Sequence, residues 1–239
     1  MASRHPDHSR CLLWSIGSGT IGRVKVYVEA PVAMAYDRGC AAWTFDPAHW
    51  GVCGQGLDES DALADLGTRV GTALEVVERV TGDEQAFARD RALCTTAERS
   101  ATLAVLAEVR PRTAQLVETS SAVLLDWDDP QRTLPGFARW RTLRQLAWHI
   151  ADTESRYYLT ALGLAARPRA DDLRVELAES YRHVCDAIAS LPADLVVESG
   201  GEVWTTTKVL RRLAWHERGE LVVMERLASR GRATLGWSA

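Results

Sequence analysis

A seven-residue pattern occurs twice in the second half of the chain. Residues 143–149 read LRQLAWH and residues 210–216 read LRRLAWH, so six of the seven positions are identical. Because tryptophan and histidine are uncommon residues, the repetition indicates two helices that present equivalent faces to one site. The alternative interpretation is a coincidence between two helices rich in leucine, arginine and alanine.

The spacing of the apolar residues predicts that both histidines of the pattern point inward. A helix buries one stripe of residues that recur every three or four positions. Around the second copy this stripe runs through Val209, Leu213, His216, Glu220, Val223 and Leu227. Around the first copy it runs through Leu146, His149, Thr153, Tyr157 and Thr160.

A buried imidazole or carboxylate costs several kcal/mol unless it is paired or bound to a metal ion. His216 and Glu220 lie one helical turn apart, and a facing helix can supply His149 as a third ligand. Three protein ligands leave a coordination position for water or substrate, and this donor set suits Zn, Ni, Fe or Mn. The sequence thus predicts a divalent metal site of His149, His216 and Glu220. The alternative is that His216 and Glu220 form a simple i,i+4 pair without a metal ion, and that His149 is a core histidine.

These stretches resemble the DinB-like (YfiT-type) superfamily of metal-binding helical bundles. There, a histidine on the second helix joins an H-x-x-x-H pair on a later helix. WRTLRQLAWHIADTE (140–154) is similar to the first pattern and VLRRLAWHERGE (209–220) to the second, within a resemblance over roughly residues 98–229. This chain departs from the family at Glu220, which stands where the second histidine of the pair is expected. A glutamate adds negative charge and changes the metal preference.

The resemblance implies a metal-dependent transferase or hydrolase that acts on a small-molecule substrate. Several members of the superfamily resemble transferases and isomerases that use a low-molecular-weight thiol such as mycothiol, bacillithiol or glutathione. A bound metal ion lowers the pKa of a thiol or a water molecule, which generates a nucleophile at neutral pH. A thiol cosubstrate is therefore one expectation, and hydrolysis by water is the other.

The first part of the chain predicts a small α+β unit. Residues 24–29 (VKVYVE) alternate as a half-buried strand does, and residues 41–45 and 51–55 predict two more strands. Asp58 is the expected N-cap of a helix that runs through Leu74 and Val77. This β-β-β-α order over about residues 24–80 resembles the HicB-like antitoxin fold, which implies a non-enzymatic interaction module as the alternative function. A small accessory domain is the other interpretation.

The remaining sequence predicts helices and no strands. Helical patterns cover residues 99–125, with an interruption at Pro111, and residues 141–164, 171–191 and 205–229. The predicted fold class is α+β. It comprises a disordered tail (1–23), a small β-β-β-α domain (24–82) and a mainly α four-helix (DinB-like) bundle (84–230).

Composition limits the remaining function classes. A net charge of -4 argues against a nucleic-acid partner, and no apolar run reaches the length of a membrane span. The five cysteines are odd in number and include no CxxC pair, which fits a reducing cytoplasm better than a disulfide framework. Oligomeric state stays open, with a homodimer as one alternative.

Several charged residues near the predicted ligands have two interpretations each. Asp152 and Glu154 follow His149, and Asp152 either orients a ligand or, like Glu154, is a solvated charge on the helix. Arg156 either holds an anionic substrate or lies at the surface. Glu217 is either solvated or supports a ligand, and His183 has no counterpart in the repeated pattern.

Overall fold

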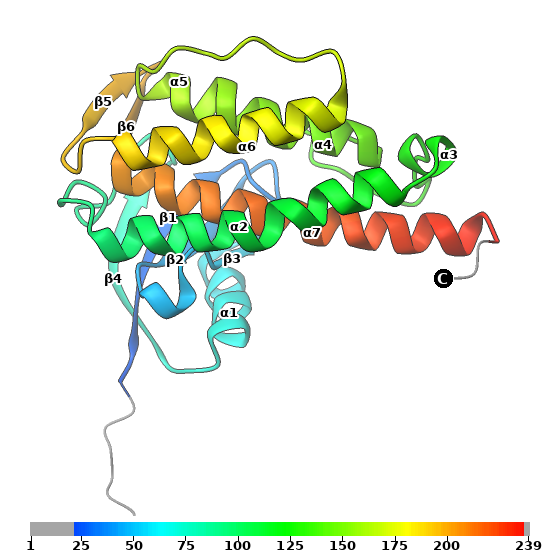
Figure 1. The fold of residues 1–239 in the computed structure, drawn as a ribbon. Coiled ribbons are helices and arrows are strands. Elements are labelled where there is room, and N and C mark those ends of the chain that lie inside the picture. The colour runs from blue at the N-terminus through cyan, green and yellow to red at the C-terminus, as the bar shows by residue number, and fades with distance from the viewer. Residues whose placement is uncertain (1–21, 237–239) are drawn as a thin grey trace, which may run out of the picture.

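The computed structural model describes residues 22–236, in which a small sheet unit lies against a layer of long helices (Figure 1). All but residues 22 and 23 of the predicted tail lie outside the described residues. The sheet unit contains β1 (Val24–Val32), β2 (Gly39–Thr44), a short 3-10 helix (Pro47–His49), β3 (Cys53–Gly56), α1 (Glu59–Val70) and β4 (Leu74–Thr81). The helices follow, so the predicted α+β fold class is confirmed.

The four strands form one sheet in the order β3-β2-β1-β4. β1 is antiparallel to β2 and parallel to β4, and β2 is antiparallel to β3. α1 begins where the Asp58 side chain accepts a hydrogen bond from the amide of Asp61, as predicted. The helix packs Ala62 and Leu66 against Val26 and Val28 of the sheet.

The predicted helix through Leu74 and Val77 is wrong beyond Val70. Gly71 adopts the left-handed conformation that ends helices, with φ of 67°. Leu74–Thr81 then alternates half-buried and exposed residues as strand β4. Leucine at 74 and valine at 77 fit a helical spacing, but the β-branched residues of LEVVERVT favour a strand. The unit is therefore β-β-β-α-β.

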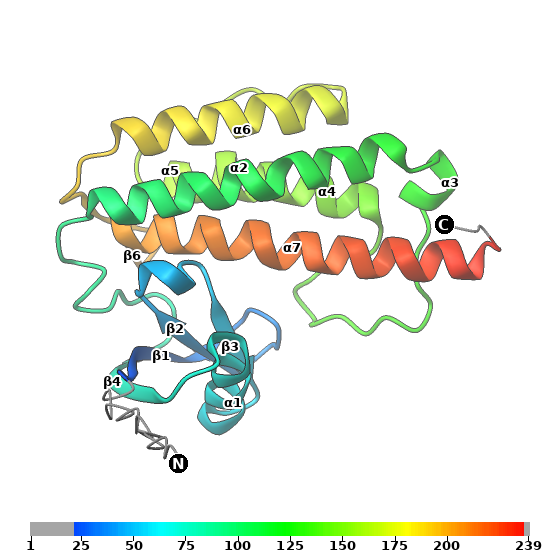
Figure 2. The same cartoon turned by 60° about the horizontal axis from the view of Figure 1, so that its bottom comes forward.

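The helical part begins at α2 (Thr96–Thr119) and the short α3 (Ala122–Leu125). α4 (Leu143–Asp152) continues through a π-helical segment (Thr153–Tyr158) into α5 (Leu159–Ala161). α6 (Leu173–Ser190), strands β5 (Val196–Ser199) and β6 (Glu202–Thr205), and α7 (Thr206–Thr234) complete the chain. α2, the α4–α5 segment, α6 and α7 run side by side in both views (Figures 1 and 2).

Two sequence expectations for this part are wrong. α2 is continuous through Pro111, because buried residues on both sides of the proline, Val109 and Thr113 among them, hold the helix in its packed position. A hairpin, β5–β6, also occurs where no strand was predicted. Its strands have only four residues each, too few for a clear alternation, and the predicted turn at Gly200 and Gly201 connects them.

α7 lies between the sheet unit and the other helices (Figure 2), and every residue from Thr206 to Ala214 is buried. Toward the sheet it presents buried cations. Arg212 donates to Glu29 of β1 at 2.8 Å, and Arg211 lies 3.7 Å from the same carboxylate. Arg211 also donates to both carboxylate oxygens of Asp90, in the connection between β4 and α2, at 3.0 and 2.9 Å. The sheet unit and the helices therefore share a buried ionic interface, while the boundary near residue 83 stays a prediction.

Two further findings concern the described residues as a whole. None of their helices combines the length and the apolar character that a membrane crossing requires. The four described cysteines, Cys40, Cys53, Cys94 and Cys185, are free thiols.

Candidate metal centre

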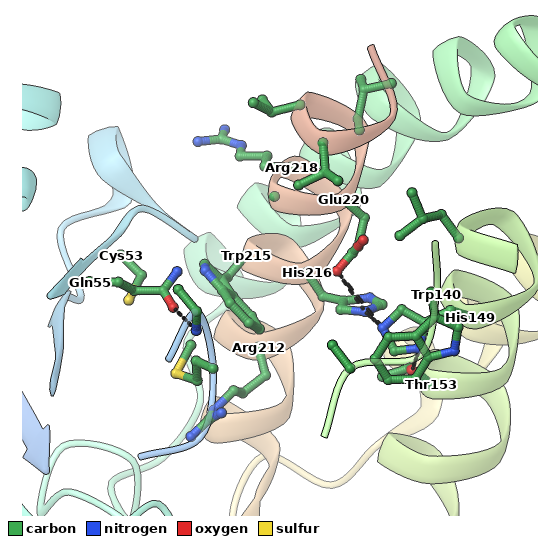
Figure 3. Close-up of a pocket in the computed structure, with 18 of the residues that line it drawn as sticks. Cys53, Gln55, Trp140, His149, Thr153, Arg212, Trp215, His216, Arg218 and Glu220 are labelled. Carbon is green, nitrogen blue, oxygen red and sulfur yellow. Dashed lines mark hydrogen bonds and ion pairs between the residues drawn. The ribbon is translucent and has the colours of Figure 1, made fainter. Parts of the chain in front are cut away.

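The structure brings His149, His216 and Glu220 together, as the two copies of the repeated pattern predicted. His149 comes from α4, and the other two residues lie one turn apart on α7 (Figure 3). The Nε2 atoms of the two histidines are 3.2 Å apart. Glu220 Oε1 lies 3.8 Å from Nε2 of His149 and 3.9 Å from Nε2 of His216.

These three distances match the dimensions of a metal site. The point equidistant from the three atoms lies about 2.1 Å from each of them, and zinc binds histidine nitrogen and carboxylate oxygen at roughly 2.0–2.2 Å. The three residues therefore fit one divalent ion and leave positions of its coordination sphere unfilled by protein.

Equivalent local structure explains why the two histidines face each other. Thr142 caps α4 and forms a reciprocal pair of hydrogen bonds with Gln145, while Thr205 caps α7. The repeated leucines and alanines, Leu143, Leu146, Ala147, Leu210, Leu213 and Ala214, are all buried. With these faces packed, the histidine that ends each copy points to the space between the helices, and the two rings meet edge to face at 5.0 Å.

The second nitrogen of each ring has a partner that fixes the ring. His149 Nδ1 lies 3.0 Å from the hydroxyl of Thr153, and His216 Nδ1 lies 3.2 Å from Oε1 of Glu154. When Nδ1 carries the proton and donates it, Nε2 keeps the lone pair that a metal ion needs. Burial lowers the pKa of both histidines, with His149 at about 3, so both rings are neutral at physiological pH. Neutral imidazole is the form that binds metal.

Glu154 belongs to the candidate site, although the sequence pattern predicted a solvated charge. Its interpretation as a solvated charge is wrong, because the side chain is 0% exposed and contacts His216. It lies five positions after His149, which places it off the inward stripe of a regular α-helix. The π-helical segment that starts at Thr153 changes the helical phase and turns Glu154 inward. The sequence carries no visible signal for that change.

A buried ionic network lies behind His216. Arg110 of α2 binds Glu154 and Glu217, and its Nη1 also donates to Ser180 Oγ at 2.9 Å. Glu217 is fully buried, so its interpretation as a solvated group is wrong. Burial raises the pKa of Glu154 and of Glu217 to about 7, although Arg110 opposes the shift.

The network contains more acid groups than cations. Glu154 and Glu217 share the single guanidinium of Arg110, and burial also raises the pKa of Glu220. Buried carboxylates without enough positive charge are unfavourable. A divalent cation bound by the three candidate ligands would compensate this surplus, which is a second way in which these residues fit a metal ion.

The other residues considered from the sequence lie outside the ligand group. Asp152 pairs with Arg156 at 2.8 Å and orients neither histidine. Arg156 also pairs with Glu176 at 2.8 Å, and it lines the cleft described below. His183 lies on α6 and is not a member of the candidate ligand group.

The candidate ligands line a cleft with a volume of about 1360 Å³. α4 and α7 form one part of its wall, and the loop between α3 and α4 forms another, from which Trp140 stacks on the His149 ring at 3.5 Å. The sheet unit contributes Met34, Cys53 and Gln55. Both parts of the chain thus border the same space.

Comparisons with known proteins identify no family for this chain. No protein-family model matches it, and no curated protein matches it. The chain resembles a solved structure of YfiT from Bacillus subtilis, which is described as a probable metal-dependent hydrolase with an unusual four-helix bundle topology. The sequences are 21% identical, the match covers 62% of this chain and 93% of YfiT, and the TM-score is 0.45. The HicB-like resemblance of residues 24–80 finds no support in these comparisons and stays a prediction.

Proposed function

We propose that this chain is a metal-dependent enzyme that acts on a small molecule bound in the cleft. His149, His216 and Glu220 hold one divalent ion in this proposal. The observation that carries it is the triangle of donor atoms, whose equidistant point lies about 2.1 Å from each atom, at the wall of a large cleft.

The reaction class we propose is hydrolysis or group transfer. A metal ion held by three protein ligands supplies a Lewis acid that lowers the pKa of a bound water or thiol. Water as the nucleophile gives a hydrolase, and a thiol such as mycothiol, bacillithiol or glutathione gives a transferase. Two imidazoles and one carboxylate suit Zn, Ni, Fe or Mn.

The chain's own residues hold the ligands in place. Thr153 and Glu154 contact the Nδ1 atoms of His149 and His216, which keeps both Nε2 atoms directed at Glu220. Trp140 stacks on His149 and keeps water from that face of the ring. These contacts pre-organise the three donors before a metal ion binds.

Elemental analysis tests the metal site. The full chain, purified without a metal-binding tag, should contain about one equivalent of a divalent transition metal, as three protein ligands imply. The double variant His149→Ala, His216→Ala should contain almost none. His183→Ala is the matched control, because this histidine lies on α6 outside the ligand group, and it should retain the metal. Unchanged metal content in the double variant would rule out this site.

A substrate screen separates the two reaction classes. Metal-loaded protein is assayed with ester and amide substrates in water, and separately with electrophiles in the presence of each thiol. Turnover that needs a thiol supports transfer, and turnover without a thiol supports hydrolysis. Glu220→Ala should abolish either activity, and full activity in this variant would contradict the proposal.

A non-enzymatic interaction module is the second candidate function, and one observation favours it. β4 lies at the edge of the sheet and pairs only with β1 among the described strands, and Val77 on it is 43% exposed. Exposed edge strands pair readily with other chains. Light scattering tests the simplest partner, a second copy: a dimer that Val77→Lys converts to monomer supports this candidate, and a monomeric wild type counts against it.

A further inference from the structure

One loop beside the candidate metal centre combines a cation with apolar side chains. The connection between α3 and α4 contributes Arg132, Leu134, Phe137 and Trp140 to the lining of the cleft. Phe137 is 40% exposed, so its ring is available for contact with a molecule in the cleft. Trp140 reaches the candidate centre itself through its stacking on His149.

Arg132 has hydrogen-bond donors to spare. Its Nη1 donates to the backbone carbonyls of Trp140 and Arg141 at 3.1 and 3.3 Å, which fixes the side chain to the loop. Within residues 22–236, Nε and Nη2 make no hydrogen bond, and no carboxylate lies within ion-pair distance.

The loop contains aspartates, but other arginines take them. The three pairs are Asp126 with Arg144, Asp128 with Arg141, and Asp129 with Arg230. Arg132 is thus left without a carboxylate in a segment that holds three of them. This distribution of charge leaves its fork of donors available to a molecule in the cleft.

Arg132 also lies within electrostatic reach of the candidate ligands. Burial lowers the pKa of its guanidinium, and the carboxylate that most opposes this shift is Glu220. A divalent ion with two neutral histidines and Glu220 carries one net positive charge, which offsets the surplus carboxylate of the network behind His216, and Arg132 adds a positive charge that this network does not neutralise. The wall of the cleft is therefore positive where it meets the centre, and it is apolar along the rest of the loop.

We infer that the cleft takes a small organic carboxylate, whose anionic group binds Arg132 and whose apolar body packs on Leu134, Phe137 and Trp140. The planar guanidinium fork matches the two oxygens of a carboxylate, which an ammonium group does not. This inference rests on the proposed function for the place of the reaction, while the recognition of the anion is assigned to Arg132.

Calorimetric titration of the full, metal-containing chain tests the inference with two probes of the same shape. The probes are 3-phenylpropionate and its neutral amide, 3-phenylpropionamide. The wild type should bind the acid at least about tenfold more tightly than the amide, since a hydrogen bond to a charged group contributes that much. Arg132→Gln should reduce this preference to within about twofold and leave the affinity for the amide and the metal content unchanged. Arg182→Gln, at an exposed position on α6, is the control and should keep the full preference.

Arg132→Lys keeps the positive charge, and it replaces Arg132→Gln in the titration if the glutamine variant does not fold. Its preference for the acid should fall at least about threefold, because the lysine cannot make the bidentate contact. A preference that survives in both variants overturns the inference, as does equal binding of acid and amide by the wild type.

The variant His149→Ala, His216→Ala separates this inference from the proposed function. If Arg132 recognises the anion, the preference for the acid persists in this variant after the metal is lost. If the preference disappears here and survives in Arg132→Gln, the carboxylate binds the metal ion instead, and the inference is wrong. A wild type that contains no metal but prefers the acid through Arg132 overturns the proposed function and supports the inference.

Discussion

Replacement of Glu220 gives the sharpest test of the candidate metal centre. Glu220→Ala removes one of the three donor atoms. Only the two histidine Nε2 atoms, which lie 3.2 Å apart, are then left to bind the ion. Changes to residues that merely contact a ligand weaken metal binding about 10- to 100-fold. Loss of a direct ligand should exceed that range, so we expect at least about a 100-fold loss of affinity, or roughly 2.8 kcal/mol.

The same substitution should hardly change the stability of the metal-free protein. The nearest partners of Glu220, the two histidine Nε2 atoms, lie 3.8 and 3.9 Å away, beyond hydrogen-bond distance. Burial raises the pKa of Glu220, which means that the folded state disfavours its charge. Removal of the carboxylate should therefore change the free energy of unfolding by about 1 kcal/mol or less.

Glu220→His should keep or tighten metal binding, because it restores two histidines four residues apart on one helix face. Zinc affinity of the metal-free protein and its variants is measured by competition with a chelating dye. Glu225→Ala is the matched control, since Glu225 lies on the same helix and pairs at the surface with Arg112. Equal zinc affinity in the wild type, Glu220→Ala and Glu220→His would refute the three-ligand site and leave at most a pair of histidines.

Three more substitutions test the surroundings of the site. Glu154→Gln should weaken zinc binding about 10- to 100-fold in the same dye competition, because Glu154 fixes the ring of His216. Unchanged zinc affinity would show that Glu154 does not position this ligand. Burial raises the pKa of Glu217 from 4.5 to about 7, so its bound proton stabilises the metal-free protein fully below pH 4.5, and this contribution is lost as the pH rises from 4.5 to about 7. Glu217→Gln should therefore flatten the decline in urea-unfolding free energy with rising pH, and an unchanged slope would contradict the shift. Glu29→Ala should destabilise the protein by about 3 kcal/mol in urea, since it leaves Arg212 buried without its closest carboxylate; an effect no larger than that of the exposed Glu75→Ala would show that the ionic interface contributes little.

Much of the fold followed from local patterns in the sequence, with exceptions where local patterns are ambiguous. Leu74 and Val77 fitted a helix, and only the pairing of β4 with β1 along the sheet made this segment a strand. Pro111 predicted an interruption, which packing on both sides of α2 overrides. In each case two local conformations are close in free energy, so long-range contacts decide between them.

Apart from Glu220, the buried charges could not be predicted from the sequence. Arg211 and Arg212 look like the solvated face of α7, yet both are buried against the sheet unit. A stripe of apolar residues shows which face of a helix packs on one core. α7 contacts two layers, and its own sequence has no apolar stripe that would predict the contact with the sheet unit. Arg110, Glu154 and Glu217 come from three different segments, so their mutual compensation exists only in the folded chain.

By itself the sequence determined the fold class and the three candidate ligands. The repeated pattern and its period of three to four residues place His149, His216 and Glu220 on inward helix faces, and this information is local to each helix. Only the tertiary structure decided the distances among the three donor atoms, the inward turn of Glu154 and the cleft that the sheet unit helps to form. Those features depend on the packing of helices and strands far apart in the chain, and packing distances are set by all the side chains between them.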